Sequence, residues 1–286
     1  MMNLADGYRH CRIIARKKAR NFYYAFLFLP RPKREALYAI YAFCHSCDSI
    51  ADGELSVDQK LTMLNGYLED LRRIERGEEV DDAVFVALAD TIRRYQIPRS
   101  YFEELVDGVM MDLGTTSYAT FEELKGYCHK VAGVVGLMVL EVLGYRSEEA
   151  KRHAETLALA MQLTNILRDL REDAERHRVY LPEEDMRRFG YTRDELFRCE
   201  TNRAFHALME FETERAHQCF RDANPLFRLI PRRARYCPRM IAALYLGILR
   251  KIERSRYDVF SRNIGLNGGE KWSLAAGVFL RNALLP

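Results

Sequence analysis

The stretch "ALYAIYAFCHSCDSIADGE" (residues 36–54) decides how this chain folds. Its first eight residues are apolar on every side of a helix, a pattern typical of a buried helix. The helix then continues into Asp48 and Asp52, which stand four residues apart and share a face with Tyr41 and His45. Two carboxylates in such a place repel each other and shift their pKa values unless a cation holds them. We therefore expect both aspartates at the wall or mouth of an interior cavity.

The same pattern recurs far along the chain in "ALAMQLTNILRDLREDAERHRVYLP" (residues 158–182). Asn165, Asp169 and Asp173 follow an apolar run at successive four-residue steps, which places them on one helical face. A single DxxxD on a helix is usually solvated charge, but two copies that each follow an all-round apolar segment favour a paired site. Mg²⁺ prefers hard oxygen ligands and is usually held by one or two carboxylates together with substrate phosphates. The sequence therefore predicts a diphosphate bridged by Mg²⁺ between the two helices.

Basic residues near both motifs suit a diphosphate ligand. Lys18 and Arg20 precede the first motif, Arg168 adjoins Asp169, and Arg178 follows the second motif. Each can form charge-assisted hydrogen bonds to phosphate oxygens, whereas we interpret Lys17 as part of a solvated helix face. The chain has no GxxxxGK[ST] motif, which excludes phosphate binding of the P-loop type.

Apolar residues recur at helical spacing along almost the whole chain, and β-type alternation is rare, so the fold class predicted is all-α. No low-complexity linker or long repeat divides the chain, and we expect one domain over residues 1–286. The predicted helices cover residues 5–25, 32–52, 57–75, 83–94, 99–112, 120–143, 147–175, 193–222, 238–260 and 269–283.

Composition narrows the class of protein further. The 286 residues include 44 Lys and Arg against 41 Asp and Glu, a net charge of +3 that does not indicate nucleic acid as a partner. Seven scattered cysteines predict reduced thiols and a cytoplasmic location, and the one CxxC, Cys44 to Cys47, is interpreted as two small buried residues. We see no signal peptide, and the apolar run 131–140 is shorter than the roughly 20 residues that span a bilayer.

Three stretches resemble the squalene and phytoene synthase family over nearly the whole length of the chain. They are "NFYYAFLFLPRPKREALYAIYAFCHSCDSIAD" (21–52), "YCHKVAGVVGLMVLEVLGY" (127–145) and, most specifically, "QLTNILRDLREDAERHRVYLP" (162–182). The resemblance implies the all-α isoprenoid synthase fold, a single helical domain around a central cavity. It also implies a prenyltransferase that joins two prenyl diphosphates head to head. The diphosphate end would be polar, and a dry apolar tunnel would protect carbocations from water.

The resemblance also assigns roles to particular residues. It implies that two or three Mg²⁺ ions and the diphosphates are held by five residues: Asp48, Asp52, Asn165, Asp169 and Asp173. Tyr127 would lie near the cation and act with the aspartates in catalysis. The substrate would also contact Lys18, Arg20, Asn21, Tyr41, His45, Asn165, Arg168 and Tyr245. From sequence alone, each tyrosine is explained equally well as an ordinary aromatic residue of the core. Only the family resemblance favours a catalytic role for Tyr127.

Some positions depart from the family pattern. His45 replaces a frequent arginine, Ser49 replaces a frequent aspartate, Asn21 replaces a common serine, and Ser117 replaces a base before Tyr118. None removes an apparent metal ligand. A histidine changes charge near neutral pH, so we expect diphosphate affinity to depend more on pH than in relatives.

Within the family, "FYYAFLFLP" and "YCHKVAGVVGLM" look most like bacterial presqualene diphosphate synthases of squalene and hopanoid biosynthesis, which use farnesyl diphosphate and in some members continue to squalene. "SRYDVFSR" (255–262) also resembles phytoene synthases of carotenoid biosynthesis, which use geranylgeranyl diphosphate. The sequence does not support NADPH, because no Gly-rich dinucleotide fingerprint follows a strand. A third reading, a non-catalytic helical assembly factor, is disfavoured by the intact aspartates.

The product would be an oil, so we also expect that the protein could work close to a membrane. The tail "KWSLAAGVFLRNALLP" (271–286) has an apolar face that suits peripheral docking at the inner face of the membrane, although the favoured explanation is a final helix packed on the domain. Other enzymes of isoprenoid biosynthesis that act downstream are the expected partners.

Overall fold

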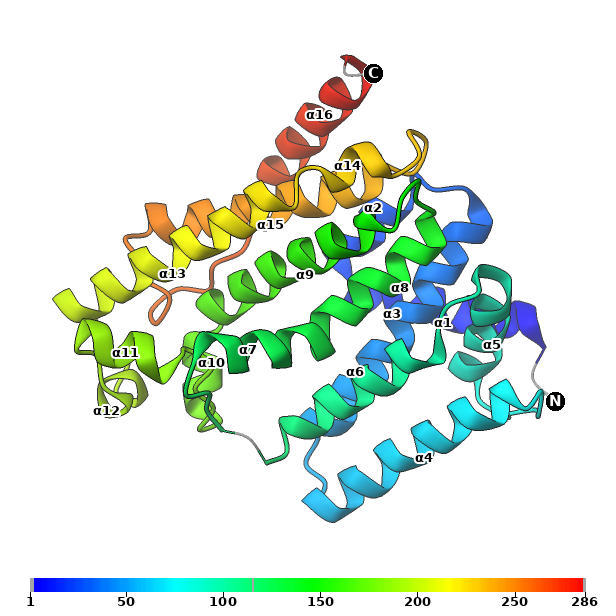
Figure 1. The fold of residues 1–286 in the computed structure, drawn as a ribbon, viewed down its shortest axis with the longest axis horizontal. Helices are drawn as coiled ribbons and strands as arrows, with labels where there is room; N and C mark the ends of the chain where they lie inside the picture. The colour runs from blue at the N-terminus through cyan, green and yellow to red at the C-terminus, as the bar shows by residue number, and fades with distance from the viewer. Residues whose placement is uncertain (1–2, 115, 285–286) are drawn as a thin grey trace.

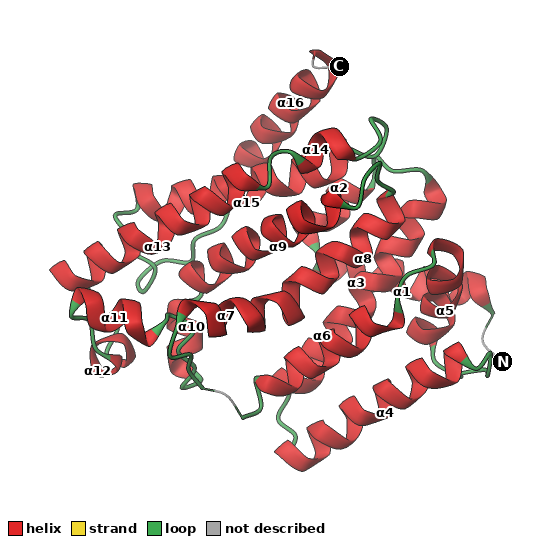
Figure 2. Ribbon diagram, viewed as in Figure 1, coloured by secondary structure: helices red, strands yellow, loops and turns green. Residues whose placement is uncertain are grey.

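The chain folds into helices joined by short loops (Figure 2). The computed structural model describes residues 3–114 and 116–284 and, within them, all side chains except those of residues 20, 21 and 281–284. This described part has no strand, only an isolated bridge between Ser117 and Val179. The predicted all-α class is confirmed.

The N-terminal helices are α1 Leu4–Lys18, α2 Arg20–Phe26, α3 Arg31–Asp52, α4 Val57–Glu75, α5 Ala83–Tyr95 and α6 Arg99–Met111. Their starts follow from local capping. The Ser56 hydroxyl accepts from the Gln59 backbone while the Gln59 side chain accepts from the Ser56 backbone, a capping box that fixes the start of α4. The Asp82 carboxylate accepts from two backbone N–H groups in the first turn of α5.

The remaining helices are α7 Phe121–Cys128, the π-helix η1 His129–Gly133, α8 Val134–Leu143, α9 Glu149–Arg168, α10 Leu170–Glu175, α11 Glu183–Phe189, α12 Arg193–Phe197, α13 Arg203–Asp222, α14 Leu226–Leu229, α15 Tyr236–Arg254 and α16 Gly268–Leu284. Figure 1 shows α9 in the middle of the molecule, with α13 on one side and α8 on the other. α15 contacts α9, α2 and α16, and α3 contacts α8 and α6. The two helices with the aspartate motifs are therefore both central.

Several predicted helices are interrupted in the structure. The helix expected over 5–25 breaks at Ala19, and the one expected over 147–175 breaks at Asp169, where φ is −100° and ψ is 13°. The helix expected over 193–222 is two helices, because Cys199 adopts a left-handed φ of 54° and Asn202 caps α13 anew. The helix expected to reach residue 260 ends at Arg254, before two residues with left-handed φ. α11 and α14 were not predicted.

The helix predicted over 120–143 contains the π-helical turn η1 between α7 and α8. Such turns are frequent at functional sites, since they displace one residue from the helical ladder. Three residues later, a Cβ added at Gly136 would lie 3.1 Å from the Ala154 carbonyl oxygen and 3.2 Å from the Ala158 Cβ. Glycine there allows α8 to approach α9 closely. Residues 121–143 are long and apolar enough to cross a bilayer by composition, but half of their most apolar window is buried in the protein, and core helices pass the same test.

Candidate active site

The two aspartate motifs line the same cavity. Asp48 and Asp52 lie on the last turns of α3, and Asp169 and Asp173 lie at the junction of α9 and α10. The cavity measures about 210 Å³ and is also lined by Ala51, Val109, Asp112, Tyr127, Gln162, Asn165, Ile166, Arg176, Arg178 and Tyr180. The break at Asp169 leaves the four-residue steps intact, because the backbone N–H of Asp173 still donates to the carbonyl of Asp169 at 2.9 Å. Five oxygen-bearing side chains predicted from sequence are thus brought together.

Asp52 and Asp169 have cationic partners within the protein. Arg176 donates to Asp52 Oδ1 at 2.9 Å, and Arg178 lies 3.4 Å from the same oxygen. Arg168 holds Asp169 through both carboxylate oxygens, with its Nε donating at 2.7 Å. Arg176 and Arg178, which follow the second motif, therefore reach across the cavity to the first motif.

Asp48 and Asp173 have no such partner among the described side chains. Burial, together with the smaller effects of the nearby Asp52 and Asp112 carboxyls, raises the pKa of Asp48 to about 7. The carboxyl borders the cavity, so cavity solvent reaches it although protein surrounds it. Burial and the Asp169 carboxyl, opposed by the charge of Arg178, together raise the pKa of Asp173 to about 7. Both carboxylates would be stabilised by a cation in the cavity.

The donor set fits Mg²⁺ that is shared with a ligand. All candidate ligands are hard oxygens, which Mg²⁺ prefers. Within the described residues, no three His, Cys, Asp or Glu side chains converge tightly enough to hold an ion by themselves. Mg²⁺ keeps several waters and takes the rest of its ligands from substrate phosphates. Opposed carboxylates across a cavity therefore suit an ion that arrives with a diphosphate.

A cluster around Asp112 lines the same cavity and was not predicted. Asp112 follows the last turn of α6, and its two carboxylate oxygens accept from the hydroxyls of Tyr127 at 3.0 Å and Tyr180 at 2.9 Å. The rings of Tyr127 and Tyr180 stack with centroids 5.4 Å apart, and Tyr118 packs against both. Burial raises the pKa of Asp112 and of Tyr127. A lone aspartate at a helix end carries no sequence signal, whereas Arg178 was visible as a base after the second motif.

An apolar cavity of about 280 Å³ adjoins the polar one, and Asp48, Gln162 and Asn165 line both. Its other walls are mostly hydrocarbon, from Phe22, Phe26, Leu37, Ile40, Cys44, Val131, Ala132, Val135, Gly136, Val139, Leu140, Leu143, Ala154, Leu157, Ala158, Met161, Leu226, Ile230, Pro238 and Ile241. Tyr41 and Tyr245 also line it, and both rings contact Phe22, at centroid distances of 6.2 and 6.1 Å. The site therefore has a charged end and an apolar end.

The remaining predicted residues lie around this site. His45 stacks against Tyr41 at a centroid distance of 6.1 Å, and burial followed by the charge of nearby Lys18 lowers its pKa. Arg168 lines a neighbouring cavity of about 300 Å³ together with Asp169. Arg20 and Asn21 begin α2, but their side chains lie outside the described residues.

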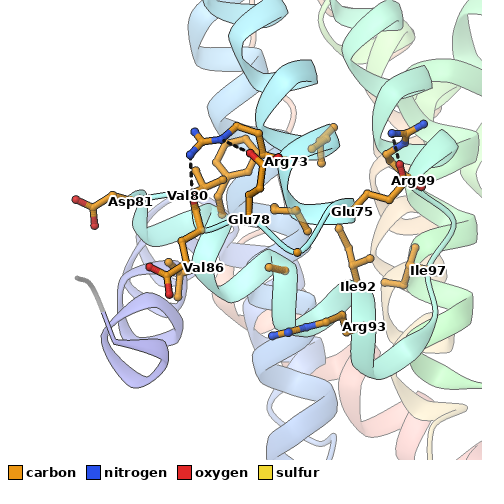
Figure 3. Close-up of a pocket in the computed structure, with 16 residues that line it drawn as sticks. Arg73, Glu75, Glu78, Val80, Asp81, Val86, Ile92, Arg93, Ile97 and Arg99 are labelled. Carbon is orange, nitrogen blue, oxygen red and sulfur yellow. Dashed lines mark hydrogen bonds and ion pairs between the residues drawn. The ribbon is translucent and has the colours of Figure 1, made fainter.

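A larger depression of about 980 Å³ lies elsewhere, between the end of α4 and α5 (Figure 3). Arg99 pairs with Glu75 at 2.5 Å on its rim, and Arg73 lies 3.4 Å from Glu78. None of the predicted site residues lines it. Its mixed rim of paired charges makes it a surface hollow rather than the reaction site.

A charged cavity that opens into an apolar one, within an all-α fold, defines the class of isoprenoid synthases, and solved structures agree. A dehydrosqualene synthase in complex with a ligand matches with a TM-score of 0.90 and 29% identity, over 97% of this chain and 96% of its own. The squalene synthase HpnC from Alicyclobacillus acidocaldarius matches with a TM-score of 0.83 and 30% identity, over 89% of this chain and 95% of its own. The predicted isoprenoid synthase fold is confirmed.

Sequence comparison gives the family. The squalene/phytoene synthase family model matches residues 15–270. The 15-cis-phytoene synthase of Synechococcus elongatus is 36% identical over 92% of this chain and 89% of its own. The phytoene synthase of Mycobacterium tuberculosis is 37% identical over 96% of this chain and 91% of its own. The chain belongs to the squalene/phytoene synthase family, whose members are prenyltransferases that condense two prenyl diphosphates head to head.

Proposed function

We propose that this chain, acting as a single domain in the cytoplasm, joins two farnesyl diphosphates to presqualene diphosphate for squalene and hopanoid biosynthesis. The observation that carries the proposal is the pair of unpartnered carboxylates, Asp48 and Asp173, in a cavity that opens into an apolar one. Diphosphates with their cations suit the first cavity, and prenyl chains suit the second. Conversion onward to squalene is a separate step, for which no NADPH site is proposed.

The carboxylates of both motifs and the Asn165 amide would hold Mg²⁺ with the diphosphates. Bound there, Mg²⁺ supplies charge neutralisation and electrophilic assistance to the departing diphosphate. Arg176 and Arg178 already reach across to Asp52, and Arg168 reaches Asp169. These arginines can turn to phosphate oxygens when substrate competes for them, which orients the reacting carbons toward the apolar cavity.

The chemistry proposed for the chain's own residues follows from the cavity walls. Departure of diphosphate from the first substrate leaves an allylic cation. The double bond of the second substrate attacks that cation, and loss of one proton closes the cyclopropane ring. Rings of Tyr41 and Tyr245 face the apolar cavity and can stabilise positive charge, while hydrocarbon walls exclude water.

Tyr127 and Asp112 are the proposed proton acceptor pair. The Tyr127 hydroxyl donates to Asp112 at 3.0 Å. Its raised pKa makes the free phenolate costly, so the phenol oxygen would accept the substrate proton as its own hydrogen passes to Asp112. The raised pKa of Asp112 favours that transfer.

Chain length is the finer part of the proposal. The apolar cavity measures about 280 Å³, slightly below the roughly 300–1,000 Å³ usual for ligand pockets, and a small cavity favours the shorter farnesyl chain. The similarity to dehydrosqualene and squalene synthases supports the same choice. The alternative is phytoene synthesis from geranylgeranyl diphosphate, which the names of the more identical sequence relatives favour.

Product analysis tests the function directly. Purified protein is incubated with Mg²⁺ and labelled farnesyl or geranylgeranyl diphosphate, with and without NADPH, and products are identified by mass spectrometry. We expect presqualene diphosphate from farnesyl diphosphate without NADPH, and no product from Asp48→Asn or Asp169→Asn. Phytoene from geranylgeranyl diphosphate alone would replace the proposal with its alternative. Absence of any product, with full biological function kept by both variants, would favour an assembly factor.

A further inference from the structure

Large apolar side chains are exposed on α2 and the turn that follows it, and on α16. Both helices pack on α15. Near the end of α2, Tyr24 and Phe28 are 59% and 60% exposed, and Leu27 is exposed beside them. On α16, Trp272 is 79% exposed and Phe279 and Leu280 are also exposed. α15 contacts both α2 and α16, and its first residue, Tyr236, lies 4.5 Å from Phe28 between ring centroids. These residues give one region of the surface a set of unpartnered apolar groups.

α16 is apolar on the side away from the protein as well as on the side that packs. Leu274 lies against Gly247 of α15, and Val278 is buried. Trp272, Phe279 and Leu280 lie on the opposite side of the same helix at spacings of seven and eight residues. A helix at an ordinary protein surface is polar on its outward side, so this outward stripe indicates contact with something other than water. Figure 1 shows α16 leaving the body at the edge where α14 and α15 lie.

The same region carries positive charge without acidic neighbours in sequence. The chain has no Asp or Glu from residue 223 to residue 252, but it has seven basic residues there. Arg228, Arg232 and Arg233 are exposed, and no described carboxylate pairs with them. An exposed apolar surface beside unpaired arginines is complementary to anionic lipid headgroups above acyl chains.

Arg235 adds an independent observation. Its side chain is buried, with 5% of the residue exposed, and its guanidinium reaches only the Ile230 carbonyl oxygen, at 3.4 Å. Burial lowers its pKa, and the charges of Arg146 and Arg232 lower it further. The backbone N–H of Arg146 donates to the Leu229 carbonyl at 2.9 Å, next to the Ile230 carbonyl that is the one acceptor of the Arg235 guanidinium among the described residues. Arg146, Arg232 and Arg235 therefore form a cluster of positive charge around this turn. A bound anion is the partner that this cluster lacks.

We propose that this docking face, formed by Tyr24, Leu27, Phe28, Arg228, Arg232, Arg233, Trp272, Phe279 and Leu280, binds the surface of an anionic lipid bilayer. The elements that carry it also close the apolar cavity, through Phe26 of α2, Leu226 and Ile230 at α14, and Ile241 of α15. Docking therefore places the hydrocarbon end of the cavity against the membrane and leaves the aspartates toward water. The benefit of this placement, delivery of an oily product to lipid, rests on the proposed function. The docking itself does not rest on that function.

A second copy of the chain is the competing occupant. A two-fold contact puts the same surface of both copies together, so the arginine cluster would face its own copy. Such a contact is repulsive without an acidic counterpart, and it is the less favoured occupant.

Vesicle flotation tests the docking face with the full chain. Vesicles contain phosphatidylcholine alone or phosphatidylcholine with an equal part of phosphatidylglycerol. We expect the wild type to float only with the anionic vesicles. Reversing both charges in Arg232→Glu/Arg233→Glu is expected to weaken binding at least roughly thirtyfold. Trp272→Ser/Phe279→Ser is expected to weaken it at least about tenfold.

Two matched variants serve as controls. Arg93→Glu/Arg94→Glu reverses two adjacent exposed arginines on α5 and changes the net charge equally, and Val57→Ser/Met63→Ser removes two exposed apolar groups from α4. Both are expected to float like the wild type. Equal flotation of all variants, or flotation on neutral vesicles alone, would overturn the proposal. So would an absence of flotation together with a dimer, seen by analytical ultracentrifugation, that only Trp272→Ser/Phe279→Ser dissociates.

Turnover in detergent micelles separates this inference from the proposed function. All four variants are expected to keep wild-type turnover in micelles, because none changes a residue of the two cavities. Flotation without turnover of either prenyl diphosphate would leave the docking face standing and remove the proposed reaction. Turnover without flotation would support the proposed reaction and overturn the docking face.

Discussion

Replacing Asp173 with asparagine is expected to stabilise the metal-free protein while abolishing its activity. The Asp173 carboxyl has no partner among the described side chains, and its pKa is raised from 3.8 to about 7 by burial and by Asp169. The folded state therefore binds this proton more tightly than the unfolded chain. Such a group lowers stability as pH rises from about 4 to about 7. Asparagine has no charge to bury, so the variant escapes this loss.

The size of the effect follows from the two pKa values. A rise from 3.8 to about 7 corresponds to about 4 kcal/mol above pH 7. Because the side chain borders a cavity that solvent fills, about half of this, ~2 kcal/mol, is expected to be measured. At pH 5 the wild-type group is still protonated in the folded state, so the gain falls below about 1 kcal/mol.

Urea unfolding in EDTA at pH 5 and pH 8 measures this gain, and Asp52→Asn is the control. Asp52 already has Arg176 and Arg178 as partners, so its replacement leaves arginines unpaired and is expected to give no stabilisation. Adding Mg²⁺ with inorganic diphosphate should stabilise the wild type more than Asp173→Asn. An Asp173→Asn variant that is no more stable than the wild type at pH 8, or one with an equal gain at pH 5, would refute the reasoning.

Three further predictions concern activity. Asp112→Asn and Tyr180→Phe each remove or weaken a hydrogen bond within the Asp112 cluster and should lower kcat about ten- to hundredfold, while Tyr118→Phe, whose hydroxyl has no partner among the described atoms, should change it little. Equal losses in all three, measured with labelled farnesyl diphosphate, would exclude a specific role for Asp112. Phe26→Ala should enlarge the apolar cavity, shift products toward those of geranylgeranyl diphosphate, and cost about 3–5 kcal/mol in urea unfolding; an unchanged product ratio would contradict the chain-length assignment. His45→Arg should lower KM about tenfold at pH 8 and less at pH 5, because the lowered pKa leaves the histidine neutral at pH 8 and delays its protonation to more acidic pH; a KM ratio that does not change with pH would count against it.

Much of the fold follows from local rules that sequence carries. The end of α3 at Asp52 and both ends of α4 lie where apolar periodicity predicted them. The breaks at Ala19 and Asp169 were missed because no glycine or proline marks them in the sequence. The π-helical turn η1 was missed because its sequence reads as an ordinary apolar helix.

The sequence by itself determined the all-α class, the family and the two aspartate motifs, because apolar periodicity and four-residue spacing are properties of neighbours along the chain. Only the tertiary structure decided which of those aspartates has a partner. Arg176 and Arg178 cross the cavity to Asp52, while Asp48 and Asp173 stay without a cation. The tertiary structure also brought Asp112 to Tyr127 and Tyr180, and α16 to the same α15 that supports Phe28. Charge pairing, burial and shared surfaces depend on distances between segments far apart in sequence, and folding alone sets those distances.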